Sequence, residues 1–320
     1  MVYKKTIIIT GGLGFIGSNY LNKYVLKYPE YLFINIDCIT YAANIANIKI
    51  SKTKNYKFEK VDIRDLPSLE NIFKKYKPTD IIHFAAESHV DLSIANPSIF
   101  VETNIIGTHN LLLLAKKYSL NRFYQVSTDE VYGSLGKKDK PFTTSSLLAP
   151  NSPYSASKAS ADMLVRSYNK TFGLNVVISR CSNNFGPNQD KTKLIPKFIS
   201  LLLQNKKVPL YAKGENIRDW IYVEDHIDAI DLIFHKGKSG GVYNIGGNAE
   251  MTNMEIVKKL LAQTGHGKNL NDGSLIEYVS DRPGHDFRYA IDTSEIKKEL
   301  GWKPKYSFEA GLKKTVDYYN

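Results

Sequence analysis

Short apolar runs alternate with amphipathic helical patterns through the first half of this sequence, and this alternation limits the possible folds more than any other feature. Strands joined by such helices pair in parallel, because each helix returns the chain to the same end of the sheet. We therefore expect an α/β fold with a doubly wound parallel sheet and helices on both faces. The expected strands are residues 5–10, 32–36, 80–84, 122–126 and 175–179, and the expected helices are 15–28, 99–118 and 153–172.

A glycine-rich turn separates the first expected strand from the first expected helix. Gly11, Gly14 and Gly17 would let the backbone approach a diphosphate, which the helix N-terminus attracts. Asp37 ends the next strand, 20 residues after Gly17, where it can accept from adenosine ribose hydroxyls and would repel a 2′-phosphate. The pattern predicts NAD as the cofactor, with contacts also from Phe15 and Ile16 and, at the adenine edge, from Asp62 and Ile63.

A tyrosine and a lysine stand one helical turn apart at the start of the expected helix 153–172. The spacing of Tyr154 and Lys158 puts both side chains on one face of that helix. An ammonium lowers the pKa of a neighbouring phenol, so we expect Tyr154 to act as a base near neutral pH.

Two adjacent carboxylates follow the strand 122–126 at its carboxyl end, directly after Ser127 and Thr128. One carboxylate alone could cap a turn. Two side by side repel each other, and in a cleft their pKa values can be driven apart. Asp129 and Glu130 would then supply one acid and one base.

The second half of the chain is organised more loosely. Shorter helices are expected at 194–204, 223–235, 253–264, 294–300 and 307–319, with a loop at 182–193 and short strands near 241–244 and 276–279. We expect residues 1–180 to form the NAD-binding domain and 181–320 a smaller, mainly substrate-binding portion, with about 219–248 returning to the first domain. Open parallel sheets bind ligands at the carboxyl edge, where these insertions would lie.

Composition excludes several other classes of protein. No apolar run reaches 18 residues, so no membrane span is expected. The apolar run after Lys4 and Lys5 leads into glycines without a cleavage site, and we expect a first strand and a cytoplasmic protein. Cys38 and Cys181 are expected to be free thiols. The net charge of +11 comes from dispersed lysines, so nucleic-acid binding is not expected.

With these motifs in place, the sequence resembles the dTDP-glucose 4,6-dehydratases, which are extended short-chain dehydrogenases/reductases with a modified Rossmann fold. The resemblance covers nearly the whole chain, and STDEVYG is its most specific motif. The matching segments are TGGLGFIGS (10–18), HFAAESHVD (83–91), TNIIGT (103–108), STDEVYG (127–133), YSASKA (154–159), NNFGPNQ (183–189), KLIP (193–196), RDWIYVEDH (218–226), YNIGG (243–247) and DRPGHDFRYAID (281–292).

The resemblance implies a role for each catalytic residue. Tyr154 would take the proton of the glucose 4-hydroxyl while a hydride passes from C4 to NAD, with Lys158 tuning Tyr154 and binding the nicotinamide ribose. Thr128 would hydrogen-bond the reacting oxygen. Glu130 would remove the C5 proton, and Asp129 would protonate the departing 6-hydroxyl. The hydride would return to C6, giving a 4-keto-6-deoxy sugar and water.

The resemblance also implies binding residues. Ala85, Ala86, Thr103 and Asn184 would line the NAD. Arg218 would clamp the substrate diphosphate, although without the resemblance a surface ion pair with Asp219 or Glu224 is the simpler interpretation. The implied substrate contacts are Ser88, Thr128, Asn183, Lys193, Leu194, Pro209, Tyr211, Arg218, Asn253, Asp281 and His285.

Several alternatives stay open at this point. A UDP-sugar 4-epimerase would share the glycines and the Tyr–Lys pair but would lack the Asp–Glu pair, and a non-catalytic NAD-binding regulator would lack one or more of these four residues. Leu92, Asn188 and Phe287 depart from the family pattern near the expected nucleotide and dimer regions, which leaves dTDP and UDP both possible. The family implies a homodimer through the helices 99–118 and 153–172, and it requires no metal.

Overall fold

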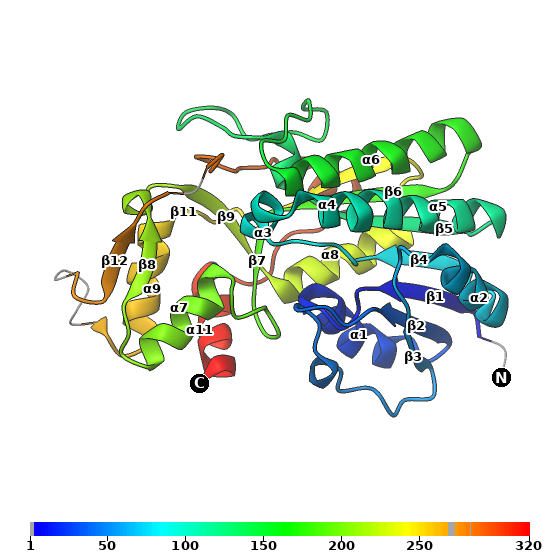
Figure 1. Ribbon diagram of the computed structural model, residues 1–320, viewed down its shortest axis with the longest axis horizontal. Coiled ribbons are helices and arrows are strands. Elements are labelled where there is room, and N and C mark those ends of the chain that lie inside the picture. The colour runs from blue at the N-terminus through cyan, green and yellow to red at the C-terminus, as the bar shows by residue number, and fades with distance from the viewer. Residues whose placement is uncertain (1–2, 268–272, 282) are drawn as a thin grey trace.

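The structure is a computed structural model that describes residues 3–267, 273–281 and 283–320. Its core is a sheet in the order β10-β6-β5-β4-β1-β2-β3, in which all neighbours are parallel (Figure 1). The expected α/β class with a doubly wound parallel sheet is confirmed. The strands of this sheet are β1 (Lys5–Thr10), β2 (Tyr31–Asp37), β3 (Tyr56–Lys60), β4 (Asp80–His83), β5 (Arg122–Thr128), β6 (Val176–Cys181) and β10 (Gly241–Ile245).

Alternate side chains of the strands pack into two separate hydrophobic layers. Ile7 and Ile9 of β1 pack on the side of α1 (Phe15–Lys27) and α8 (Val223–Lys236), whereas Ile8 packs on the opposite side. That opposite layer is covered by α2 (Leu66–Tyr76), α5 (Thr108–Lys117) and α6 (Pro153–Phe172). Because both faces are covered, the strands are apolar along most of their length.

A smaller lobe is built beside the carboxyl edge of the large sheet (Figure 1). It holds the three-stranded sheet β11-β9-β7 and the pair β12-β8. β9 runs directly into α8 and then β10, so the chain returns to the large sheet before it ends in the small lobe. The elements of this lobe are β7 (Asn183–Phe185), β8 (Val208–Tyr211), β9 (Ile217–Tyr222), β11 (Glu250–Thr252), β12 (Ile276–Val279), α7 (Leu194–Leu203), α9 (Asn253–Gln263) and α11 (Phe308–Tyr319). In contrast, α10 (Ser294–Leu300) packs against β10 and α8 beside the large sheet.

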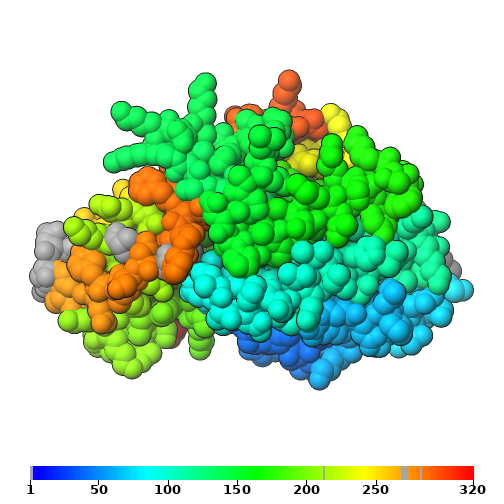
Figure 2. Space-filling model, turned by 45° about the horizontal axis from the view of Figure 1, so that its top comes forward, coloured from blue at the N-terminus to red at the C-terminus, as the bar shows by residue number. Residues whose placement is uncertain are grey.

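The connections complete the chain. The short helical segments are η1 (Ile45–Asn47), α3 (Val90–Ala95), α4 (Pro97–Phe100), η2 (Val101–Gly107), η3 (Asp129–Tyr132) and η4 (Ala212–Gly214). The long connection between η3 and α6 extends over the surface above α6 (Figures 1 and 2). None of the helices in the described ranges is long and apolar enough to cross a membrane.

The expected helix over residues 99–118 is present as one unbroken helical run, but its middle is π-helical. The chain forms α4, then the π-helical segment η2, and only then α5. Within η2 the Asn104 side chain accepts from the Glu87 amide at 2.8 Å and donates to the Glu87 carbonyl at 3.0 Å and the Ser157 hydroxyl at 2.9 Å. The extra residue of a π-turn shifts the apolar positions that follow it, but a shift of one position is too local to be recognised in a short helical pattern.

Other elements lie where no regular structure was expected. The predicted loop 182–193 contains β7, and α2, α3, β8, β9 and β11 had no counterpart among the expected elements. β9 carries Arg218 and Asp219, which interrupt its apolar run, yet both are buried. Strands are predicted from runs or alternation of apolar residues, so a strand with buried charged residues is missed.

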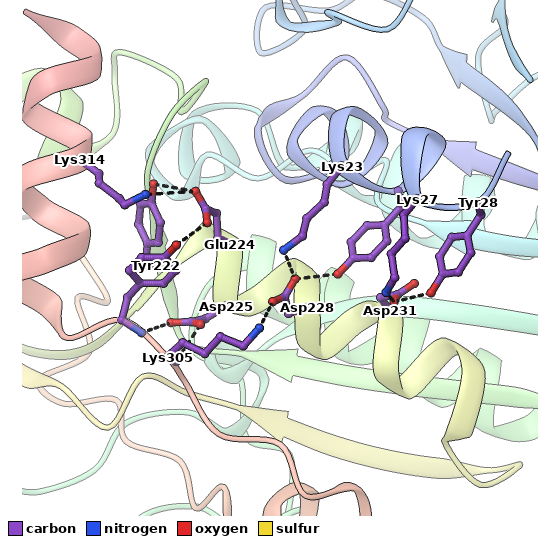
Figure 3. Close-up of polar contacts among 12 residues, drawn as sticks. Lys23, Lys27, Tyr28, Tyr222, Glu224, Asp225, Asp228, Asp231, Lys305 and Lys314 are labelled. Atoms are coloured by element: carbon purple, nitrogen blue, oxygen red, sulfur yellow. Dashed lines mark hydrogen bonds and ion pairs between the residues drawn. The ribbon is translucent and has the colours of Figure 1, made fainter. Parts of the chain in front are cut away.

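A row of carboxylates on α8 ties three parts of the chain together (Figure 3). Asp228 accepts from Lys23, from the Tyr24 hydroxyl at 2.7 Å and from Lys305 at 2.7 Å. One turn later Asp231 accepts from Lys27 at 2.9 Å and from Tyr28 at 2.8 Å. These contacts fix α1 and the segment before α11 against α8, and α1 is the helix that begins at the glycine-rich turn.

Candidate active site

The turn between β1 and α1 is shaped for close backbone contact. Gly11 has a φ of +70°, and a Cβ there would lie 2.7 Å from the backbone of Ala85. Gly14 is the N-cap of α1, and no side chain caps this helix. A Cβ at Gly14 would meet only the Gly11 carbonyl, at 3.3 Å. The N-terminus of α1 is therefore open to an anionic group.

A cleft of about 340 Å³ runs from this turn to the ends of β5 and α6. It brings together 20 of the predicted site residues, from both the cofactor and the substrate sets. They are Gly11, Gly14, Phe15, Ile16, Gly17, Asp37, Asp62, Ile63, Ala85, Ala86, Ser88, Thr103, Thr128, Asp129, Glu130, Tyr154, Lys158, Asn183, Asn184 and Lys193. The uncapped helix, the glycines and a carboxylate at the end of β2 fit a dinucleotide with free ribose hydroxyls.

Asp37 is held in one orientation at the end of β2. One of its oxygens accepts from the Leu13 amide at 3.0 Å and the other from the Ile39 amide at 2.9 Å. Burial raises the pKa of Asp37, and these two backbone hydrogen bonds oppose that rise. Further along the edge, Asp62 is paired with Arg64 at 2.7 Å, which lowers the pKa of Asp62.

The end of β5 carries the proposed acid and base groups. Thr128 is the N-cap of η3, and its hydroxyl accepts from the Glu130 amide at 3.3 Å and lies 3.4 Å from Asp129 Oδ1. The Tyr154 hydroxyl faces Thr128 from α6, and Lys158 Nζ donates to the Val126 carbonyl at 2.8 Å. One strand end and one helix start thus hold all five predicted catalytic side chains around the same part of the cleft.

Asp129 is 2% exposed, and no hydrogen bond to its Oδ2 is recorded among the described residues. Burial raises the pKa of Asp129 well above its usual value, and the charges of Glu130 and Asp219 raise it further, whereas Arg218 opposes the rise. Such a setting favours the neutral form of the carboxyl group, which can give a proton to a substrate oxygen.

The expectation that Tyr154 has a lowered pKa is wrong for the protein without ligands. Burial raises the pKa of Tyr154 well above its usual value, and the carboxyl groups of Glu130 and Asp129 add to the rise. Lys158 is itself fully buried, which lowers the pKa of its ammonium. The sequence shows that the two residues share a helix face, but it does not show how strongly burial acts on both.

The remaining predicted substrate residues do not line this cleft. Arg218 is buried and donates to the carbonyls of Ile217 at 2.7 Å and Asp286 at 2.9 Å, and its guanidinium lies 4.3 Å from the Tyr289 ring. The surface position assumed for an ion pair of Arg218 with Asp219 or Glu224 is wrong, because Arg218 is only 5% exposed.

His285, on the segment that includes Asp286, donates from Nδ1 to Asp281 Oδ1 at 2.6 Å and packs edge-on against Tyr211. Tyr211 and Pro209 belong to β8, Leu194 begins α7, and Asn253 begins α9. These residues form a second group in the small lobe, and its contact with the substrate stays a prediction.

Some cleft residues were not among the predicted ones. Tyr41, Glu87, Gln189 and Asp190 line the cleft; Glu87 and Gln189 lie inside matching motifs but were assigned no role there. His226, fully buried, contacts Asn184 Oδ1 at 2.8 Å, while Asn184 Nδ2 donates to the Ser182 carbonyl. Asn184 Oδ1 is therefore the acceptor, and His226 carries its proton on Nδ1. The pairing of β7 with β9 brings the two residues together, and the sequence analysis predicted neither of these strands.

The parallel sheet, the glycine turn and the Tyr–Lys pair define an enzyme of the extended short-chain dehydrogenase/reductase class. A family model described as GDP-mannose 4,6 dehydratase matches residues 8–315. A dTDP-glucose 4,6-dehydratase of Haemophilus influenzae is 47% identical over 98% of this chain and 97% of its own length. The enzyme of Salmonella typhimurium is 46% identical over 98% and 92%. The chain belongs to the dTDP-glucose 4,6-dehydratase family.

Solved structures agree with this placement. A dTDP-glucose 4,6-dehydratase from Bacillus anthracis in complex with NAD is 48% identical, with a TM-score of 0.90 over 98% of this chain and 96% of that one. DesIV from Streptomyces venezuelae, crystallised with NAD and a second ligand, is 44% identical, with a TM-score of 0.93 over the same shares. A UDP-glucose 4-epimerase from Thermotoga maritima is 32% identical, with a TM-score of 0.90 over 98% of both chains.

Proposed function

We propose that the protein is a dTDP-glucose 4,6-dehydratase that converts its substrate to dTDP-4-keto-6-deoxyglucose and water. The observation that carries this proposal is the burial of Asp129 beside Glu130 at the end of β5, where both carboxyl groups lie near Tyr154 and Thr128. Oxidation and reduction alone need only the Tyr–Lys pair. A second acid and a second base are needed when a proton must leave carbon and an oxygen must leave as water.

NAD, when bound, supplies a hydride acceptor for sugar C4 and later a hydride donor for C6. The glycine turn, Asp37 and Lys158 would hold it, with its diphosphate at the N-terminus of α1. An internal cycle of this kind ends with the cofactor unchanged, so we expect the purified protein to retain it. We also expect the protein to act in the cytoplasm.

The side chains of the cleft divide the proton transfers among them. Tyr154 accepts the proton of the 4-hydroxyl, with Lys158 stabilising the phenolate. The resulting 4-ketone acidifies the C5 proton, which Glu130 removes. Asp129 gives its proton to the 6-oxygen, which leaves as water. When the hydride returns to C6, C5 takes up a proton, so the two protons removed by Tyr154 and Glu130 equal the two returned to the 6-oxygen and to C5.

The substrate's nucleotide is proposed to extend toward the small lobe. Lys193 Nζ donates to the Ser88 carbonyl at 2.8 Å and so crosses from the start of α7 to the loop after β4. Arg218, held by three backbone carbonyls, has the planar donor geometry that a diphosphate prefers. The same-fold rival, a UDP-sugar 4-epimerase, would form no 4-keto-6-deoxy product.

We also propose that the protein is a homodimer. The segment η2, α5 and α6 lies on one face of the molecule (Figure 2), and it exposes apolar side chains that a monomer would leave in water. Val101 is 48% exposed, Ile106 47%, Leu113 37%, Met163 59% and Phe172 49%. An exposed apolar face on paired helices of this kind fits a two-fold interface.

The proposed activity is tested with a panel of dTDP- and UDP-hexoses, with products identified by mass and NMR. We expect dTDP-glucose to lose one water and to give a 4-keto-6-deoxy sugar. Tyr154→Phe should lower the rate by about 10²–10⁴-fold and prevent NADH formation on substrate addition. An epimerised hexose as the product, or full activity in Tyr154→Phe, would contradict the proposal.

A further inference from the structure

A buried ion pair, Asp162 and Arg180, lies next to Lys158 on the side away from Tyr154 along α6. Asp162 follows Lys158 by one turn of α6, so Tyr154, Lys158 and Asp162 share one helix face. Arg180, in β6, donates from Nε to Asp162 Oδ2 at 3.0 Å. The two side chains are 7% and 1% exposed. A buried pair of this kind needs a reason beyond stability, because well-packed apolar residues often stabilise a core equally well.

Arg180 is fixed from its other side. Its Nη1 donates to the Tyr132 hydroxyl at 2.9 Å, and the guanidinium lies 4.9 Å from the centre of the Tyr132 ring. Tyr132 in turn donates to Asn244 Oδ1 at 2.8 Å, and Asn244 donates to the Phe142 carbonyl at 3.0 Å. This chain of contacts across η3, β6 and β10 holds the guanidinium against Asp162.

Lys158 is a buried cation whose recorded hydrogen bond goes to the neutral carbonyl of Val126. The titratable groups that act on Lys158 or Tyr154 come from four elements: Tyr154 and Asp162 from α6, Cys181 from β6, His83 from β4, and Asp129 and Glu130 from η3, with Arg180 behind Asp162. Within this set, Asp162 is the carboxylate whose charge favours the ammonium of Lys158.

We propose that Asp162 is a positioning residue that keeps Lys158 charged, and that Arg180 occupies the Asp162 carboxylate so that Lys158 stays available to Tyr154 and to the bound cofactor. The inference rests on the proposed function for the role of Lys158. It adds two residues, Asp162 and Arg180, that touch neither substrate nor cofactor and act through Lys158.

The direction of each pKa agrees with this arrangement. Burial lowers the pKa of Lys158, and the charge of Asp162 opposes that fall. Burial raises the pKa of Asp162, and the charges of Arg180 and Lys158 together with the Ser127 hydroxyl oppose that rise. Burial raises the pKa of Cys181 to about 12 and lowers that of His83 to about 3, so both are neutral near pH 7.

The test is a pH titration of Lys158 in the NAD-bound protein, using lysine labelled with ¹³C at Cε. The Lys158 signal is assigned by its loss in Lys158→Arg. Asp162→Asn should lower the pKa of Lys158 by about one unit or more, because an anion is removed beside a buried cation. Arg180→Gln should raise it, because Asp162 is then free to pair with Lys158. Opposite shifts are the signature that a merely structural role would not give.

The double variant Asp162→Asn/Arg180→Gln removes both charges of the pair and leaves Lys158 as the buried ion. The pKa of Lys158 should then lie between the values in the two single variants. If one single variant does not fold, the double variant is compared with the other single variant. The two then differ only in the charge that the unfolded variant was meant to remove, and the pKa of Lys158 should shift in the same direction as expected for that variant. Coincident titrations in the folded variants, or shifts of the same sign in both single variants, would overturn the inference.

The pH profile of turnover is the second measurement. The alkaline limb, where Lys158 loses its proton, should move to lower pH in Asp162→Asn and remain in place in Asp162→Glu, which keeps the charge. A wild type without dehydratase activity would count against the proposed function, whereas the titration of Lys158 tests the positioning role on its own.

Discussion

At the scale of single residues, the most informative position is Asp129, because replacing it with asparagine should lower activity but raise stability. Asp129→Asn removes the proton that the 6-oxygen needs, and Glu130→Gln removes the base at C5. Both variants should still reduce the bound cofactor on addition of dTDP-glucose, seen as a lasting absorbance of NADH, while product formation falls by about 10²–10⁴-fold. Wild type should show no net NADH. A variant that makes product at the wild-type rate would contradict these roles.

The stability of Asp129→Asn follows from the raised pKa of Asp129. Above the usual carboxyl pKa the unfolded chain releases a proton that the folded protein retains, so the free energy of unfolding falls as the pH rises. Asparagine has no such proton. The variant should therefore gain stability over wild type as the pH rises from about 4 to 7, at roughly 2–4 °C in Tm per kcal/mol. A gain that is constant with pH would contradict the buried neutral acid.

The sequence predicted these residue types well and their environments less well. Some functional residues form local patterns within a strand–turn–helix unit and can be recognised from the sequence alone. These are the spaced glycines, Asp37 and the Tyr–Lys pair. The buried state of Arg218 and the contact of His226 with Asn184 depend on β9, a strand that its charged residues conceal. Long-range pairing of this kind leaves little trace in local periodicity.

At the scale of elements, the contact between α1 and α8 holds the glycine turn in place. Asp228 is 15% exposed; burial raises its pKa, but the hydrogen bonds from Lys23, Lys305 and Tyr24 lower it below the usual value overall. Asp228→Asn should lower the free energy of unfolding at neutral pH by about 1.5–3 kcal/mol. Because the pKa of Asp228 is lowered on folding, its carboxylate stabilises the fold above the usual pKa of 3.8, and this stabilisation is lost on acidification. The difference in free energy of unfolding between wild type and Asp228→Asn should therefore shrink below about pH 4.

Asp317→Asn is the matched control, since Asp317 is exposed on α11. Chemical denaturation of both variants at several pH values separates the two cases. Equal stability of the two variants at neutral pH would show that the carboxylate row on α8 does not anchor α1.

At the scale of the whole molecule, the exposed apolar face of η2, α5 and α6 predicts a dimer. Leu113→Glu places a charge on this face and should convert the dimer to monomer in sedimentation equilibrium. Leu147→Glu is the control, because Leu147 is 88% exposed on the connection before α6. A wild type that sediments as a monomer at micromolar concentration would contradict the proposed interface.

The central claim, an elimination enclosed between two hydride transfers, is tested most directly with dTDP-glucose deuterated at C4. The account predicts that wild-type product carries the deuterium at C6 of the same molecule, because the hydride taken from C4 is returned after water has left. When substrate that carries both deuterium at C4 and ¹³C in its glucose ring is mixed with unlabelled substrate, all the deuterium should remain in ¹³C-labelled product. Deuterium found at C4 of an epimerised sugar, or lost from the sugar altogether, would contradict the account.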